Sequence, residues 1–102
     1  MSTGATRPPR RLGLAVVHGR SMLPTLREGE RLLVLHGAVP RPGGLAVCRL
    51  PAGVVAVKRV EARGPGSWAV VSDNPEGASA VVDDGDVLAV VLARVWPRPR
   101  PF

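Results

Sequence analysis

Short apolar segments recur along the chain and are separated by turns rich in glycine and proline. The predicted strands cover residues 12–17, 31–36, 45–50, 53–60, 67–72 and 87–96. Eleven prolines and twelve glycines leave little room for long helices. Short strands at this spacing, without helices between them, are typical of antiparallel sheets that curl toward a barrel. We therefore predict an all-β domain, a small antiparallel coiled sheet or partial barrel.

The connecting segments supply the expected organisation. Residues 45–50 and 53–60 form a hairpin around Pro51-Ala52, and Gly64-Pro65-Gly66 turns the chain into the next strand. A short helical turn is expected at 24–29, a polar loop at 73–80 and a turn at 83–86. A length of 102 residues is enough for one modest core. The domain organisation expected is a flexible basic tail over 1–11, one β domain over 12–96, and a Pro/Arg tail over 97–102.

Charge changes this picture little. The net charge is +6, but the arginines are scattered and concentrate at the two ends. No basic helix and no interleaved aromatics indicate a dedicated nucleic-acid site, so solvated tails are the favoured interpretation. The longest apolar run near the C-terminus, residues 87–93, falls short of the ~20 residues that span a bilayer. The single cysteine, Cys48, fits a reducing compartment, and we expect a cytoplasmic chain without a transmembrane segment.

Lysine usage introduces candidate chemistry. Lys58 is the only lysine among fourteen Lys plus Arg. Period-two alternation places it on one strand face with Val54, Ala56 and Val60. Burial on an apolar face disfavours the charged ammonium, and a neutral lysine can act as a general base, which arginine cannot. A lysine that extends from a strand edge into water remains the competing interpretation.

Ser21 is the candidate nucleophile for such a base. It follows Gly19, which allows close backbone approach, and precedes Pro24, which fixes the turn. A loop of this kind can direct a hydroxyl and its own N–H toward one point, as an oxyanion site requires. Ser21 and Lys58 together point to a Ser-Lys hydrolase.

Four segments in order carry a family resemblance. Residues 19–26, Gly-Arg-Ser-Met-Leu-Pro-Thr-Leu, resemble the nucleophile box of the signal peptidase I family. Gly29-Glu30 with the strand after it, Val57-Lys58-Arg59-Val60, and Ser72-Asp73-Asn74-Pro75 resemble its three following boxes. Ser72 stands where the family has glycine, and the family's Ser-x-Asp-Ser-Arg sequence is absent after Asn74.

The resemblance implies the catalytic sheet of that family and a set of roles. Ser21 is the expected nucleophile, Lys58 the general base, and the backbone of Ser21 and Gly19 the oxyanion site. Supporting the dyad, Asp73 is expected to pair with Arg59, and Ser79 is the candidate for orienting the lysine. The substrate-pocket candidates are Met22, Leu23 and Pro24.

A short form without a membrane anchor most resembles the maturation proteases of nickel-type superoxide dismutase. The resemblance implies that the partner is the leader peptide of a nickel superoxide dismutase precursor. In that dismutase the chain's own α-amino group ligates nickel, so the leader must be removed first. The sequence contains no metal-ligand spacing, so no cofactor is expected and nickel belongs to the substrate.

Other interpretations stay open. The chain could be a general signal-peptidase-like protease that lacks its anchor, or a catalytically silent barrel-like binding module. A fragment of a self-cleaving repressor is disfavoured because no helix-turn-helix pattern is present. Cys48 could be a thiol nucleophile with His18 or His36 as its base, although a buried structural cysteine is the favoured interpretation. The acidic residues of 83–86 lack the spacing of a calcium loop and indicate a turn.

Overall fold

The structure is a computed structural model that describes residues 9–102. It is all-β, which confirms the predicted fold class. Within the described residues the strands and one 3₁₀ turn are β1 (Arg11–Val16), β2 (Arg31–His36), β3 (Leu45–Arg49), β4 (Val55–Gly64), β5 (Ser67–Val71), β6 (Ala80–Asp83), η1 (Asp84–Asp86), β7 (Val87–Trp96) and β8 (Arg100–Pro101).

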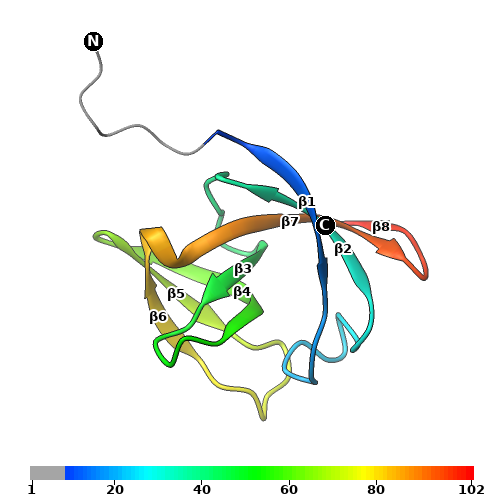
Figure 1. Ribbon diagram of the computed structural model, residues 1–102. Coiled ribbons are helices and arrows are strands. Elements are labelled where there is room, and N and C mark those ends of the chain that lie inside the picture. Colours follow the sequence, from blue (N-terminus) through cyan, green and yellow to red (C-terminus); the bar gives the residue numbers. More distant parts are fainter. Residues whose placement is uncertain (1–8) are drawn as a thin grey trace.

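The strands form one open antiparallel sheet in the order β1-β2-β7-β3-β4-β5-β6, with β8 paired to β7 (Figure 1). Strand β7 joins the two halves, because it pairs with β2 on one side and with β3 on the other. Irregular register interrupts the β2–β7, β3–β7 and β4–β5 pairings. Such bulges bend strands and increase their twist, which lets the sheet curl around its side chains.

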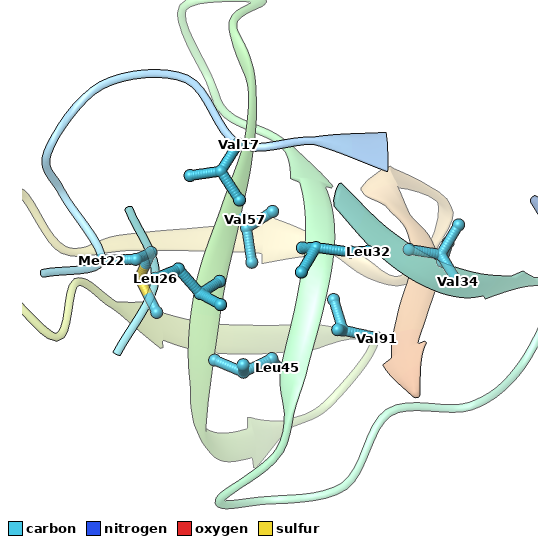
Figure 2. Close-up of a cluster of buried hydrophobic side chains, with 9 residues drawn as sticks. Val17, Met22, Leu26, Leu32, Val34, Leu45, Val57 and Val91 are labelled. Atoms are coloured by element: carbon cyan, nitrogen blue, oxygen red, sulfur yellow. The ribbon is translucent and has the colours of Figure 1, made fainter. Parts of the chain in front are cut away.

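Two apolar clusters form the core, and β3 and β4 contribute to both. The first cluster, shown in part in Figure 2, contains Val17, Met22, Leu26, Leu32, Val34, Leu45, Val57, Ala89 and Val91. The second contains Ala46, Cys48, Val60, Trp68, Val70 and Val82. Leu45 and Ala46 are neighbours that face different clusters, as strand alternation requires. Burial on both faces explains why β3 is a nearly continuous apolar run, Leu-Ala-Val-Cys, before Arg49.

Several elements differ from the sequence-based expectation. The polar loop expected at 73–80 ends earlier, because Ala80–Asp83 forms β6 and buries Val82 against the second cluster. The helical turn expected at 24–29 is a set of turns. Residues 97–102 do not extend away as a tail, since the Phe102 N–H donates to the Leu92 carbonyl and β8 pairs with β7. Of the N-terminal tail, residues 1–8 lie outside the described residues and Arg11 begins β1.

Candidate active site

The segment that carries Ser21 connects β1 to β2, and two of its side chains are anchored in the core. Met22 and Leu26 are 1% and 0% exposed, and both belong to the first apolar cluster. Figure 2 shows their side chains among those of the strands. The Leu26 N–H donates to the Met22 carbonyl over 2.9 Å and closes the turn. Met22 therefore anchors the segment, which corrects the expectation that it lines a substrate pocket; Leu23 is half-buried and Pro24 is exposed.

Gly19 shapes the entrance to this segment. Its φ of +77° is a conformation that residues with a Cβ rarely adopt. The Gly19 N–H donates to Glu28 Oε1 over 3.1 Å, so a carboxylate already occupies this amide. A second anionic oxygen would meet that carboxylate, and we therefore do not retain Gly19 as an oxyanion donor.

Lys58 is buried in β4, with 4% of its surface exposed. Its partner across the β3–β4 ladder is Ala46, and alternation places it with Val60 on the side of the second cluster. Burial lowers the pKa of Lys58, with the Cys48 thiol acting weakly in the opposite direction. Val54 does not contribute to this burial, because it precedes the strand and is 59% exposed.

The hydrogen-bond partner of Lys58 is Ser72, the residue after β5. Lys58 Nζ lies 2.6 Å from Ser72 Oγ, and Ser72 Oγ donates to the Ala78 carbonyl over 2.8 Å. A hydroxyl has one proton, so Ser72 must accept from the lysine. One lysine N–H is thereby fixed, and the nitrogen lone pair of a neutral Lys58 is directed elsewhere.

Gly77 makes this contact sterically feasible. A Cβ at Gly77 would lie 2.4 Å from both Cβ and Oγ of Ser72. Ser79, expected to orient the lysine, is exposed, and the hydrogen bond from Lys58 goes to Ser72 instead. The sequence contained a signal for Ser72, because it replaces the family's glycine in a chain that lacks the usual downstream serine.

Arg59 and Asp73 form the strongest ion pair near the site. Arg59 donates from Nε to Asp73 Oδ1 over 3.0 Å and from Nη2 to Asp73 Oδ2 over 2.6 Å. Thr25 Oγ1 donates to the same Oδ2 over 2.6 Å, and Arg59 Nη1 donates to the Gly43 carbonyl over 2.8 Å. The hydrogen bonds from Arg59 lower the pKa of Asp73, and the one from Thr25 adds to this effect. Bidentate geometry of this kind is specific as well as strong.

Asn74 joins this region to the serine segment. Its backbone N–H donates to the Ser21 carbonyl over 2.9 Å, and its Nδ2 donates to the Arg20 carbonyl over 3.0 Å. Within residues 9–102 no hydrogen bond joins Ser21 Oγ directly to Lys58 Nζ. Catalytic hydrogen bonds in unliganded enzymes are often long and tighten only when substrate binds.

The surroundings of Cys48 disfavour the alternative in which its thiol is the nucleophile. Cys48 is fully buried in the second cluster, and burial raises the pKa of its thiol to about 11. A protonated buried thiol is a poor nucleophile. His36 packs against Gly13 of β1, where a Cβ would lie 2.7 Å from its Nε2, and His18 is exposed.

Comparison with known proteins gives one family. The chain matches the Peptidase S24-like family over residues 1–95. A search of curated proteins finds no match. The family match supports a function of the serine-peptidase type. Across residues 9–102, no helix has the length and apolar character needed to traverse a bilayer.

Proposed function

We propose that the chain, which belongs to the Peptidase S24-like family, is a serine endopeptidase that uses a Ser-Lys dyad to remove a short N-terminal leader. The observation that carries the proposal is the burial of the chain's only lysine against Ser72, beside a fixed serine segment. An arginine or an exposed lysine could not serve as a neutral base at this position.

In the proposed reaction, Ser21 Oγ attacks the scissile carbonyl and its proton passes to Lys58 Nζ. The Ser21 N–H stabilises the developing oxyanion. The protonated Lys58 then donates to the leaving amine, which frees the new N-terminus and leaves the leader's acyl group on Ser21. Water hydrolyses this ester in the second half, again with Lys58 as the base.

Ser72 has a defined part in this scheme. Because its own proton is bound to the Ala78 carbonyl, it holds one N–H of Lys58. In the proposed scheme the lone pair of the neutral amine then stays available to Ser21. We assign to Ser72 the orienting role for which the family resemblance had indicated Ser79. The Arg59–Asp73 pair holds the neighbouring position of β4.

For the substrate we propose the leader of a nickel superoxide dismutase precursor, cleaved in the cytoplasm. The support is the resemblance of the four boxes to the signal peptidase I family, and of Ser-Met-Leu-Pro-Thr (21–25) and Asp-Asn-Pro (73–75) to the maturation proteases. The chemistry of an N-terminal nickel ligand, which cleavage must create, supports the same substrate. The enzyme itself needs no metal in this scheme.

Incubation of the purified chain with the precursor, followed by N-terminal sequencing of the product, tests the proposal. We expect one new N-terminus with the wild type and none with Ser21→Ala. An intact precursor beside efficient cutting of a secretory signal peptide would favour a general signal-peptidase-like enzyme. Cleavage of neither would favour a silent binding module.

A further inference from the structure

Three consecutive residues after β5 reach three different parts of the candidate site. Ser72 bonds to Lys58, and Asp73 bonds to both Arg59 and Thr25. Asn74 bonds to the carbonyls of Arg20 and Ser21. One tripeptide, residues 72–74, therefore contacts both the base strand and the serine segment.

We propose that Thr25 and Asn74 are positioning residues that hold Ser21 in register with Lys58. The inference rests on the proposed roles of Ser21 and Lys58 and adds two residues to them. Ser21 lies in the turn closed by the Leu23 N–H and the Arg20 carbonyl, and Thr25 lies in the overlapping turn closed by the Leu26 N–H and the Met22 carbonyl, so the Thr25 bond to Asp73 fixes the segment that carries Ser21. Asn74 fixes the carbonyls of the two peptide groups on either side of Ser21.

The Asp73 carboxylate gives this attachment its rigidity. Its Oδ1 accepts from Arg59 alone, and its Oδ2 is shared by Arg59 and Thr25, with both distances at 2.6 Å. Arg59 is itself fixed by the Gly43 carbonyl. Thr25 thus donates to a carboxylate whose position is already fixed by Arg59 of β4. The turn is therefore attached to β4 through Asp73, in addition to the packing of Met22 and Leu26 in the first apolar cluster.

Loss of this attachment acts on the geometry between nucleophile and base. A displacement of about 1 Å between reacting groups can cost on the order of 10²-fold in rate. Ser72 keeps its bond to Lys58 when Thr25 changes, so the protonation of the base is expected to stay the same. The signature is therefore a lower kcat at an unchanged pH inflection.

The kinetic experiment compares four variants on one cleavable leader peptide. Thr25→Val removes the hydroxyl at nearly constant shape, and Thr25→Ser keeps a hydroxyl at the same position. Asn74→Ala removes the side-chain bond to the Arg20 carbonyl and provides the test if Thr25→Val does not fold. Ser67→Ala is the matched control, since it removes a hydroxyl at the opposite end of the β4–β5 hairpin. We expect Thr25→Val and Asn74→Ala to lower kcat about ten- to a hundredfold with KM and the pH inflection unchanged, and Thr25→Ser and Ser67→Ala to remain near wild type. A kcat within twofold of wild type for both Thr25→Val and Asn74→Ala overturns the inference.

Hydrogen exchange supplies a readout that needs no substrate. The Asn74 backbone amide donates to the Ser21 carbonyl, so its exchange reports the contact between the two segments. We expect this amide to exchange at least tenfold faster in Thr25→Val than in wild type or Ser67→Ala. Unchanged exchange overturns the inference even if cleavage falls. If the wild type cleaves no peptide, the proposed function fails while the exchange measurement still decides whether Thr25 and residue 74 hold the serine segment.

Discussion

The β4–β5 hairpin has an arginine–aspartate pair near each of its ends, and the two pairs differ in surroundings. At one end Arg59 and Asp73 have side chains that are 29% and 14% exposed, and Thr25 joins them. At the other end Arg63 and Asp84 are 49% and 48% exposed, and Asp84 also accepts from Trp68 Nε1. A cavity of about 690 Å³ opens beside the second pair, with Arg63, Trp68 and Asp84 in its lining.

The two ends share residue types but not chemistry. Each also has a glycine beside a serine side chain: Gly77 against Ser72, and Gly64 against Ser67. Only the first end has a buried lysine and lies next to the segment with the proposed nucleophile, Ser21. At the second end, the Arg63 guanidinium lies over the Trp68 ring at 4.6 Å and the polar groups satisfy one another. Burial and the neighbouring segment, rather than the ion pair, make one end a candidate active site.

The largest expected effect is on the rate of leader cleavage, and it is found by substituting one cationic residue at each end of the hairpin. We expect Lys58→Arg to lower the rate of leader cleavage by about 10²–10⁴, because arginine keeps the charge but cannot accept a proton. Arg63→Lys should leave the rate within twofold. Steady-state kinetics on a leader peptide, with circular dichroism to verify folding, measures both. Retention of more than about a tenth of the activity by Lys58→Arg would remove lysine from the mechanism.

The pH dependence should follow the same lysine. Burial lowers the pKa of Lys58, so the cleavage rate should rise with pH and have its inflection below the ~10.4 of a free lysine. Because Lys58 is the only lysine, an NMR titration of its labelled side chain gives this pKa without ambiguity. Since the unfolded chain holds more protons between the folded and unfolded pKa values of Lys58, its contribution to stability should also rise with pH across that window. A flat rate profile from pH 6 to 10 would contradict the base assignment if chemistry limits turnover.

A smaller effect is expected from the paired glycines. A Cβ at Gly77 would meet Ser72 at 2.4 Å, whereas one at Gly64 would meet Ser67 Oγ at 3.0 Å, a contact that rotation of the serine can relieve. We expect Gly77→Ala to lower kcat on the order of tenfold by displacing Ser72 from Lys58, and Gly64→Ala to stay within twofold. The NMR signal of Lys58 should shift only in Gly77→Ala. An equal loss in both variants would mean that the Ser72 contact has no special part.

The fold class was predictable because turn residues mark the ends of the strands. Gly64 ends β4, and Pro65-Gly66 turns the chain into β5 as expected. Strand β6 was missed because only Val82 of its four residues is buried, so it lacks a clear apolar pattern. Met22 was misassigned because the sequence cannot distinguish an apolar residue that lines a pocket from one that anchors a turn.

The sequence indicated Ser72 only by its replacement of the family's glycine, and its pairing with Lys58 depends on a register that the sequence does not show. At the hairpin tip Gly64 pairs with Ser67, and that register, continued along β4, would place Asp73 opposite Lys58. An irregularity between Val60 and Ala62 shifts the pairing by one residue, so that Arg59 pairs with Val71. Continued by one step, the shifted register brings Ser72 opposite Lys58, and Asp73 becomes the diagonal neighbour of Arg59. No local pattern in the sequence marks this bulge.

The last expected difference concerns stability rather than rate and compares the two aspartates. Asp73→Asn removes the charge from a partly buried, three-donor site, and we expect it to lower the free energy of unfolding by about 1.5–3 kcal/mol. Asp84→Asn should cost about 0–1 kcal/mol, because its ion pair is half exposed and the amide oxygen can still accept from Trp68 Nε1. The hydrogen bonds that lower the pKa of Asp73 add stability above the unfolded pKa of ~3.9, and this stability is lost as pH falls through the folded pKa. Urea unfolding at pH 7 and pH 3 should therefore show the gap between the two variants narrowing in acid. Equal losses at pH 7 would mean that the two ends of the hairpin carry equivalent ion pairs, and that Arg59–Asp73 is no more than a surface contact.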